Sequence, residues 1–556
     1  MSKRHPSAFL RCVRCDYREP LGWPLERCPR CGEEWLDVIY DYEKLAANWA
    51  DVVQSRPDDM WRYFDLLPLQ DAANRVTMGE GGTPLLRAVS LGMMLGTPTI
   101  YVKDERQGPT GSFKDRQAAL SISMMKELGI TEAVVASTGN VAISYSAYCA
   151  LAGIKLWAFL TSLVPPEKVR EVAIYGSEVV KVTGTYDQTK KVAAEFAKRK
   201  GLFLDRGIRS IAAREAMKTV AFEIASQLPA YLGPGTTRWR SPDWYIQAVS
   251  GGMGPVGVWK GFQELRQLGL IERMPRLACI QSEGCAPMVW SFQKGLAEAE
   301  PVLHPRTLVT TLATGNPGPA YSFLARVIRE HGGAFEAVND AETFRAMHVM
   351  AKLSGLSMEP AAAVAFAGLF KLLSKGIIRR DEVVVVNCSG HTFPVEKHLL
   401  GEDWARTVDV QEAPVMEEGL LGSLEQLDPH ARSVAILEDD PGAARLLRRI
   451  LQARGNYQIF EAQDGRSGLE LIRRERPDVV LLDLMMPEMD GFGVLDAMRA
   501  DEELREIPVV VVTAKELTPG ERARLSGQIR MLLQKGMFTD EELLHEVLDA
   551  MQGEKP

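Results

Sequence analysis

The chain has 556 residues, too many for one ordinary hydrophobic core, so two or three domains are expected. Hydrophobic residues make up 46% and charged residues 25%, the balance of a soluble globular protein. A net charge of -8 argues against a general nucleic-acid-binding surface. No apolar run has the length of a signal-peptide core or a membrane span, so we expect a cytoplasmic protein that binds neither membranes nor nucleic acids.

Four cysteines near the amino terminus form two C-x-x-C pairs: Cys12 with Cys15, and Cys28 with Cys31. Two such pairs can coordinate one zinc ion tetrahedrally, and zinc with four cysteine ligands is structural because catalysis needs an open position. Free or redox-active cysteines are the alternative, but a redox motif typically has a single C-x-x-C beside a βαβ pattern. We predict a zinc ribbon over residues 1–36.

Residues 37–400 contain apolar, strand-like runs that alternate with amphipathic helical stretches. This order predicts an α/β domain with a mostly parallel sheet, whose ligands bind at the carboxyl ends of strands. The runs expected to be buried strands are EAVVAS, KLWAFL, SEVVKV, DWYIQAV, RLACIQS and DEVVVVN.

Lys114 lies in the polar, glycine-containing run PTGSFKDR. Such a turn can pack around a planar cofactor, and lysine is a covalent catalyst through imine formation. If the sequence KDR is taken alone, the alternative interpretation is that Lys114 is an ordinary loop lysine that happens to precede an aspartate and an arginine. To act as a base the lysine must be deprotonated, so its pKa must be lowered by desolvation or by neighbouring positive charge.

The STGN loop follows the first of these strands. It comprises Ser137, Thr138, Gly139 and Asn140, and it precedes a helical run beginning near Ala142. Backbone N–H groups at such a helix start can bind an anion, whereas a simple helix N-cap is the alternative for this motif alone.

A glycine-rich run, SGGMGPVG, begins at Ser250 directly after another expected strand. Its glycines let backbone amides approach a phosphate closely. They also match the G-x-G-x-x-G fingerprint of dinucleotide-binding proteins, so a dehydrogenase is a rival interpretation. We favour it less, because Pro255 interrupts the expected turn into a helix and the acidic Glu283 comes later than the usual spacing of about 20 residues.

From about Phe9 to Leu400 the chain resembles threonine synthases, members of the tryptophan-synthase-β-like, fold-type II pyridoxal-phosphate enzymes. The resemblance rests on PTGSFKDR and on further blocks in the same order: GEGGTPLL, YVKDE, ASTGN, GTYDQT, KTVAFEI, QSEGCAP and MEPAAA. It implies a two-lobed enzyme body. It also implies a lyase that converts O-phosphohomoserine and water to threonine and phosphate, with pyridoxal 5'-phosphate held by Lys114 as an internal aldimine. We also expect a homodimer that binds a small amino-acid substrate.

The resemblance assigns roles to residues of the three motifs. Asn140 is implied to bind the phenolic oxygen of the cofactor, and Ser389, at the end of VVVVNCS, to face its pyridine nitrogen. Lys218 is an expected substrate contact, and Lys103 and Arg116 are further candidates for phosphate or charge control, with structural ion pairs as the alternative. The residues implied to bind the substrate carboxylate are Ser137, Thr138 and Gly139. Those implied to bind the cofactor phosphate are Ser250, Gly251, Gly252, Met253 and Gly254.

Three departures from the family pattern lie where substrate identity is expected to be determined. Gly108 stands in place of an asparagine, Met217 in place of a glutamine, and Pro394 in place of a lysine. A related β-replacing or eliminating lyase or dehydratase is therefore an alternative, and a non-catalytic amino-acid-sensing signalling protein is another.

Residues 401–431 lack clear periodicity and are expected to form a linker. In the α/β unit that follows, Glu438 and Asp439 end one expected strand and Asp483 ends another. Three carboxylates that converge at strand ends can form a magnesium site.

Residues 432–556 resemble response-regulator receiver domains, which are doubly wound and flavodoxin-like. The resemblance implies that Asp483 is the phosphoacceptor, that Thr513 and Lys535 contact the phosphoryl group, and that the partner is a sensor histidine kinase or a phosphotransfer protein. A pseudo-receiver is the alternative, although every expected polar position is filled. We expect phosphorylation to alter the activity, oligomerisation or partner choice of the enzyme.

Overall fold

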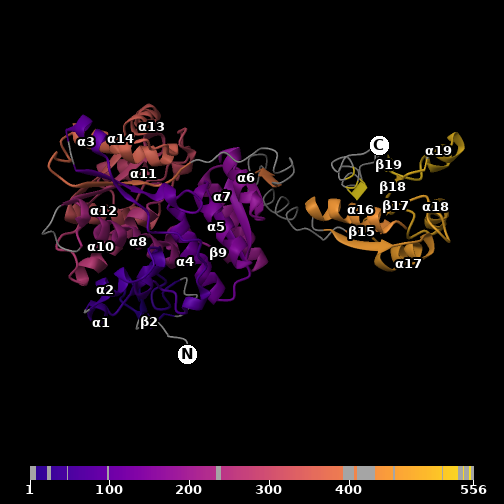
Figure 1. Ribbon diagram of the computed structural model, residues 1–556, viewed down its shortest axis with the longest axis horizontal. Coiled ribbons are helices and arrows are strands. Elements are labelled where there is room, and N and C mark those ends of the chain that lie inside the picture. Colours follow the sequence, from indigo (N-terminus) through magenta and orange to yellow (C-terminus); the bar gives the residue numbers. More distant parts are fainter. Residues whose placement is uncertain are drawn as a thin grey trace. The chain divides into compact units, whose positions relative to one another are not determined.

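The computed structural model describes residues 8–21, 27–46, 48–96, 99–232, 239–391, 406–409, 433–454, 457–515 and 517–535, and residues 543, 547, 550 and 551 of a last helix. The chain divides into two compact units, Met1–Leu424 and Glu425–Pro556 (Figure 1). Among the helices described, none has the length and apolarity needed to cross a membrane.

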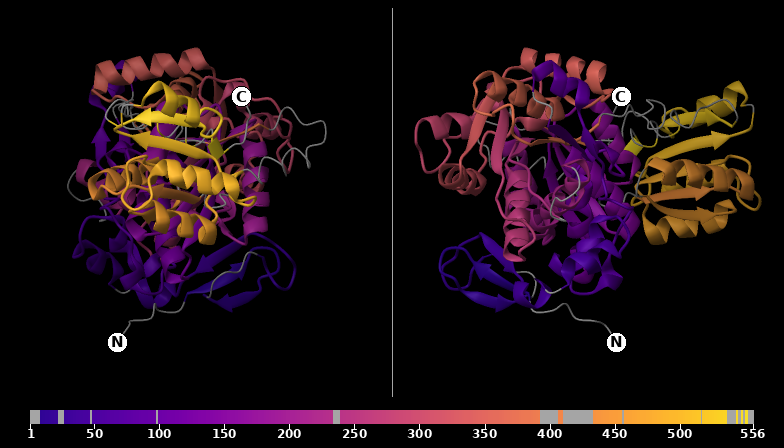
Figure 2. Two further views of the ribbon diagram at one scale, coloured as in Figure 1. Left: turned by 90° about the vertical axis from the view of Figure 1, so that its right-hand side faces the viewer. Right: turned by 60° about the vertical axis from the view of Figure 1, so that its left-hand side comes forward.

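A small antiparallel sheet begins the first unit, with the strand order β2-β1-β3. Figure 2 shows these strands, in indigo, at one edge of the unit. Cys12 is the last residue of β1, and Cys28 and Cys31 lie in the turn region before β3. The strands are β1 Phe9–Cys12, β2 Arg18–Pro20 and β3 Leu36–Ile39, followed by the helices α1 Tyr42–Ala46 and α2 Trp49–Gln54.

A six-stranded sheet forms the larger lobe, in the order β12-β11-β10-β13-β5-β4. Its strands are parallel except β4, which pairs with β5 in the antiparallel sense. Its strands are β4 Leu85–Arg87, β5 Ile100–Asp104, β10 Trp244–Ala248, β11 Arg276–Ser282, β12 Gly333–Val338 and β13 Val384–Cys388.

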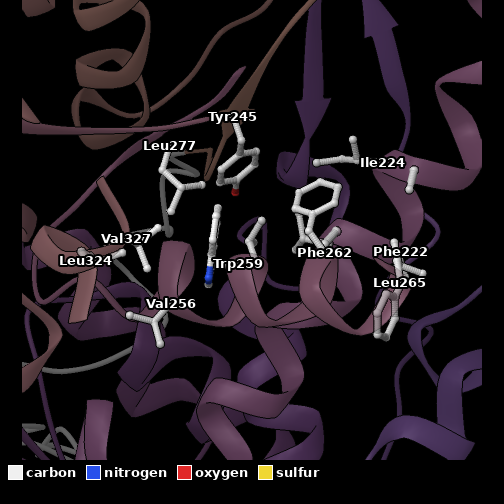
Figure 3. Packing of buried hydrophobic residues seen from close by; sticks show 14 of the residues in the cluster. Phe222, Ile224, Tyr245, Val256, Trp259, Phe262, Leu265, Leu277, Leu324 and Val327 are labelled. Carbon is white, nitrogen blue, oxygen red and sulfur yellow. The ribbon is translucent and has the colours of Figure 1, made fainter. Parts of the chain in front are cut away.

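Helices cover both faces of this sheet because its buried strands are apolar on both sides. Tyr245 of β10 points into one core cluster, whereas Trp244 and Ile246 point into the other. Figure 3 shows Tyr245 next to Trp259 of α10, and Phe262 of the same helix belongs to this first cluster. The helices on that face are α8 Ile211–Gln227, α10 Met253–Gln267 and α12 Pro319–His331, and those on the other are α3 Val89–Leu95, α13 Asp340–Ser354 and α14 Pro360–Ser374.

Helices α8 and α10 pack closely through two glycines of α10. A Cβ on Gly257 would lie 2.5 Å from the Arg214 carbonyl oxygen, and a Cβ on Gly261 would lie 2.5 Å from that of Lys218. These contacts are too short for any side chain larger than hydrogen, so both positions require glycine. Met217, also on α8, is packed against Gly257 and fully buried.

A five-stranded parallel sheet forms the smaller lobe, in the order β14-β8-β7-β6-β9. Helices α4, α5 and α6 share one core cluster with it, and Phe196 of α7 packs against Trp157 and Phe159 of β7 on the opposite face. The elements are α4 Lys114–Glu127, β6 Glu132–Ser137, α5 Asn140–Ala152, β7 Lys155–Thr161, α6 Pro166–Ile174, β8 Glu178–Thr183, α7 Tyr186–Lys200, β9 Phe203–Leu204 and β14 Arg406–Asp409. All six strands expected in the enzyme domain are confirmed.

Strand β14 lies within the expected linker. It pairs in parallel with β8, so that Arg406 is opposite Val180 and Asp409 is opposite Thr183. A strand of 4 residues at a sheet edge takes its hydrogen bonds from one neighbour, and no periodicity in its own sequence is needed to place it. Part of the connection to the second unit is therefore built into the sheet of the smaller lobe.

The second unit has a parallel sheet of order β16-β15-β17-β18-β19 with helices on both faces, the doubly wound arrangement expected. Along β15, Ala435 and Leu437 face one core cluster, while Val434 and Ile436 face the other. Helices α17 and α18 pack on the first face and α16 on the second. The elements are β15 Ser433–Leu437, α16 Pro441–Arg454, β16 Gln458–Ala462, α17 Gly465–Glu475, β17 Val479–Leu482, α18 Gly491–Ala500, β18 Val509–Thr513, α19 Pro519–Leu525 and β19 Met531–Gln534.

Candidate active site

A cavity of about 420 Å³ in the first unit is lined from both lobes. Its walls come from the carboxyl ends of β6, β10 and β13 and from the starts of α4, α5 and α10. This is where open α/β sheets bind ligands. The residues expected to bind the cofactor all line it: Lys114, Asn140, Ser250, Gly251, Gly252, Met253, Gly254 and Ser389.

Lys114 is the first residue of α4, and the turn before it is fastened to the end of β13. The Phe113 N–H donates to the Ser389 carbonyl oxygen at 3.0 Å, and the His391 N–H donates to that of Gly111 at 2.8 Å. Gly111 has a φ of 72°, in the left-handed region that glycine adopts without strain. Two segments far apart in the sequence thus fix the position of one lysine.

The pKa of Lys114 is lowered to about 8, because the surrounding protein desolvates its ammonium form. The carboxylates of Glu359 and Asp205, which also line the cavity, oppose this effect. A lysine with this pKa has an appreciable neutral fraction near neutral pH, as covalent and base catalysis require.

Gly108 packs against the carboxylate of Asp115. A Cβ on Gly108 would lie 2.4 Å from Asp115 Oδ2, which accepts a hydrogen bond from the Thr110 N–H at 2.9 Å. Burial raises the pKa of Asp115 to about 6, although the hydrogen bonds from Thr110 act in the opposite direction. Gly108 therefore makes room for the carboxylate that holds the turn together.

The glycine-rich run forms a cradle at the start of α10. Gly252 caps the helix with a φ of 83°, and a Cβ on Gly251 would meet no atom within 4 Å, so space beside the backbone is open. The first N–H groups of a helix have no partners within it and favour an anion. Pro255 lies in the first turn of α10, where its missing N–H costs no helical bond, so the expectation that it interrupts the helix is wrong.

The cavity fits pyridoxal phosphate. Its lining includes Lys114, the anion cradle with open space at Gly251, and the hydroxyl group of Ser389. The volume is adequate for an aromatic ring that carries a phosphate group. Asn140 adds an amide whose Nδ2 donates to Glu359 Oε1 at 2.7 Å.

The hydroxyl groups of the STGN loop have partners inside the protein. Ser137 Oγ accepts hydrogen bonds from the N–H groups of Gly139 at 3.0 Å and Ala142 at 3.1 Å. Thr138 Oγ1 donates to the Thr311 carbonyl oxygen at 3.0 Å. Ser137 and Thr138 line the cavity, and the capping of the helix start by Ser137 accounts for the local shape of the loop.

Lys218, expected to contact the substrate, does not line the cavity, and its contacts are those of the structural ion pair that was the alternative. It is fully buried on α8, where its Nζ donates to Glu215 at 2.7 Å and to Glu264 at 3.0 Å. The Tyr40 ring centroid lies 4.2 Å from the same nitrogen. Lys218 belongs to the junction of α8 with α10, and its partners leave it no role toward a ligand.

Lys103 and Arg116 are also structural. Lys103 Nζ donates to Glu223 Oε2 at 2.6 Å, and Arg116 pairs with both Glu105 and Glu223 at 2.8 and 2.5 Å. None of the four side chains lines the cavity, and breaking such a buried network costs about 3–5 kcal/mol. Lys103 and Arg116 therefore form structural ion pairs, which was the alternative interpretation of both residues.

Met217 and Pro394 give no information on substrate choice at the cavity. Met217 is buried between α8 and α10, away from the cavity wall. Pro394 lies outside the described residues.

Three cations also line the cavity, and the sequence analysis did not single them out. This cationic wall consists of Lys190, Arg206 and Arg209. Lys190 pairs with Asp187 at 2.6 Å, and Arg209 Nε pairs with Glu34 Oε2 of the N-terminal segment at 2.7 Å. The GTYDQT block directly precedes Lys190 in the sequence, and this position was the signal by which the lysine could have been identified as a candidate site residue.

The four N-terminal cysteines are gathered into one cluster, with every pair of sulfur atoms within 4.8 Å. Cys12 and Cys31 Sγ are 3.5 Å apart, and Cys15 and Cys28 Sγ are 3.6 Å apart. Zinc–sulfur bonds of about 2.3 Å in a tetrahedron place sulfur atoms about 3.8 Å apart, so the donor set and spacing fit zinc.

The carboxylates Glu438, Asp439 and Asp483 of the second unit also lie within 4.8 Å of one another. Lys535 Nζ donates to Asp483 Oδ2 at 2.7 Å and to Glu438 Oε1 at 2.8 Å. The Lys535 N–H donates to the Thr513 carbonyl oxygen at 2.9 Å. All five polar residues expected in a receiver site thus come together, and their oxygen donors fit magnesium.

Comparison with known proteins defines the class. Residues 76–390 match the family model of pyridoxal-phosphate dependent enzymes, and residues 434–548 match that of response regulator receiver domains. The chain belongs to the pyridoxal-phosphate-dependent enzyme family and carries a receiver domain, and it is a lyase of that family. The dehydrogenase interpretation is wrong.

Its relatives include threonine synthases. That of Methanocaldococcus jannaschii is 36% identical over 383 residues, which cover 68% of this chain and 91% of the relative. The threonine synthase of Methanosarcina acetivorans is 32% identical over 418 residues, which cover 75% of this chain and 98% of the relative. The threonine synthase of Mycobacterium tuberculosis strain H37Rv is 33% identical over 343 residues, which cover 61% of this chain and 89% of the relative.

Proposed function

We propose that the first unit converts O-phosphohomoserine and water to threonine and phosphate. The observation that carries this proposal is that one cavity is lined by Lys114, by an anion cradle at the start of α10 and by the three cations of the cationic wall. The cradle holds the phosphate of the cofactor, and the cationic wall offers a second place for an anion. A substrate with its own phosphate group needs such a second place.

The residues of the cavity have distinct tasks in this reaction. The backbone of Ser250–Gly254 would bind the cofactor phosphate, Ser389 would hold the ring nitrogen, and Asn140 would hold the ring oxygen. When bound, pyridoxal phosphate supplies an electron sink for charge that develops on the substrate carbons. Lys114 Nζ, whose lowered pKa gives it an appreciable neutral fraction, takes and returns the substrate protons.

The test is to incubate cofactor-loaded protein with O-phosphohomoserine and to measure threonine and phosphate together. Both products in equal amounts support the proposal. No phosphate release at saturating substrate would exclude it. Phosphate release without threonine would favour the eliminating lyase, and a visible cofactor absorbance without turnover of any amino acid would favour the sensor.

Replacing Lys190 with methionine should raise the KM for O-phosphohomoserine about tenfold, since a hydrogen bond to a charged group contributes about 1.5–3 kcal/mol. The kcat should change less, because Lys190 belongs to the cationic wall and not to the reacting centre. Steady-state kinetics of Lys190→Met measure this effect.

The matched control is Lys191→Met, which removes the neighbouring lysine of α7. Lys191 is exposed and does not line the cavity, so the KM should stay at the parental value. An equal KM for both variants would show that Lys190 does not bind the substrate phosphate.

We propose a structural zinc ion at the four cysteines. Its role follows from the contacts that the segment makes: Arg209 pairs with Glu34, and Lys260 pairs with Asp37 at 2.5 Å. The segment is thereby attached to a residue that lines the cavity and to α10.

Cys28→Ser should lower the zinc content from one ion per chain and reduce the melting temperature of the first unit, because a structural metal contributes directly to folding free energy. Elemental analysis and thermal unfolding measure the two effects. Cys149→Ala is the matched control, since Cys149 is a buried thiol of α5 outside the cluster and should leave the zinc content unchanged. Full zinc occupancy in Cys28→Ser would contradict the proposed ligand set.

For the second unit, we propose that Asp483 accepts a phosphoryl group from a sensor histidine kinase or a phosphotransfer protein and that this controls the enzyme. Magnesium held by Glu438, Asp439 and Asp483 would offset the charge of the phosphoryl group. Support for control comes from β14, which joins the connection between the units to β8.

A further inference from the structure

A buried lysine of α6, Lys168, lies behind the cavity wall. Only 6% of the surface of Lys168 is exposed to solvent. Its Nζ donates hydrogen bonds to Asn140 Oδ1 at 2.6 Å and to Glu359 Oε2 at 2.5 Å. Asn140 Nδ2 in turn donates to Glu359 Oε1, which closes a ring of three side chains. Two of the three, Asn140 and Glu359, line the cavity, whereas Lys168 does not.

Two glycines leave space for this ring of side chains. A Cβ on Gly390 would lie 2.7 Å from Glu359 Oε1 and 3.1 Å from Asn140 Nδ2. A Cβ on Gly139 would lie 3.1 Å from Lys168 Cδ. Any larger residue would displace a member of the ring, so the backbone on both sides is adapted to its presence.

Lys168 and Glu359 together fix which end of the Asn140 amide is available to a ligand. An ammonium has only donors, so it must pair with the amide oxygen, Oδ1. The Asn140 Nδ2 group then points to Glu359 and keeps a second hydrogen for a ligand in the cavity. Without the lysine, Oδ1 would lose this donor and the Glu359 carboxylate would lose its cation, so the amide would be held through Nδ2 alone.

We propose that Lys168 is a positioning residue that orients Asn140 as a hydrogen-bond donor to the ring oxygen of the cofactor and holds Glu359 in a neutral pair. The inference rests on the proposed placement of the cofactor at Lys114. It extends the site to a residue that touches neither cofactor nor substrate.

The test is Lys168→Met in the full chain, with the dissociation constant of pyridoxal phosphate and the visible spectrum as readouts. The dissociation constant should rise about tenfold or more, the scale of effects when a partner that orients a ligating group is lost. The absorbance maximum should shift, because the ring oxygen loses an oriented donor. Lys168→Arg, which keeps the charge and the donors, should restore most of the affinity.

A double variant separates positioning from simple charge balance. Lys168→Met leaves the Glu359 carboxylate unpaired, and Lys168→Met/Glu359→Gln removes that charge as well. We expect the double variant to fold like the parent and still to bind the cofactor weakly. Parental affinity in the double variant would overturn the inference, because Lys168 would then serve only to neutralise Glu359.

Lys375→Met is the matched control, since Lys375 pairs with Glu336 at 2.5 Å and does not line the cavity. It should keep the parental affinity and spectrum. Parental affinity in Lys168→Met would also overturn the inference, whatever the substrate is. Tight cofactor binding by the parent without threonine production would instead exclude the proposed reaction and leave the role of Lys168 intact.

Discussion

Lys114→Ala is expected to abolish the visible absorbance of the bound cofactor and to lower turnover of O-phosphohomoserine by at least about three orders of magnitude. The reason is that the amine of Lys114 lies at the cavity with a lowered pKa, whereas Lys168 and Lys190 are held in ion pairs with Glu359 and Asp187. Absorbance spectra and phosphate release measure the two effects.

The control is Lys126→Ala, which removes a lysine from the other end of α4. Lys126 is exposed and remote from the cavity lining, so its variant should keep parental absorbance and turnover. If Lys114→Ala retained the absorbance, the covalent role would pass to another lysine, and Lys190 would be the next to replace because it lines the same cavity.

The strands and motif loops were predictable because their signals are local. Alternation of apolar runs with helical stretches placed β6, β10 and β13, and the rule for parallel sheets placed the loops after them at one cavity. The STGN loop and Ser250 could therefore be brought together by these rules, whereas Lys114 and Ser389 were added to them through the resemblance to threonine synthases.

The charged residues were less predictable because their partners are distant in the chain. Lys218 stands beside a motif, but Glu264, which pairs with it, is 46 positions away on α10. Lys168 and Glu359 are separated by 191 positions. The MEPAAA block contained Glu359, yet nothing in it indicates a partner on α6. Pairing of this kind depends on how helices pack, which periodicity does not encode.

Strand β14 was missed for a related reason. Its 4 residues form a strand only because the edge of β8 offers unpaired backbone groups. The strand bears on the proposed control: β8 ends at Thr183, and the next helix, α7, begins with Tyr186 and includes Lys190, both of which line the cavity. Along the chain, β14 is the last described element of the enzyme unit before the second unit.

Beryllofluoride, a mimic of the phosphoryl group, is expected to change kcat/KM for O-phosphohomoserine by at least about fivefold, the lower end of typical allosteric coupling. Asp483→Ala should abolish this response and leave the basal rate unchanged, because Asp483 belongs to the second unit. The double variant Thr407→Pro/Val408→Pro should also abolish it. Two consecutive prolines remove at least one N–H that β14 can donate to β8, whichever of the two faces that strand.

The control is Glu417→Pro/Glu418→Pro, which places the same two prolines in the connection but outside the described residues. It should retain the response to beryllofluoride, since it leaves β14 intact. A parental response in Thr407→Pro/Val408→Pro would show that control does not pass through β14. An unchanged rate and an unchanged assembly state of the parent on addition of beryllofluoride would exclude control within the chain altogether, and the receiver domain would then act on a partner protein.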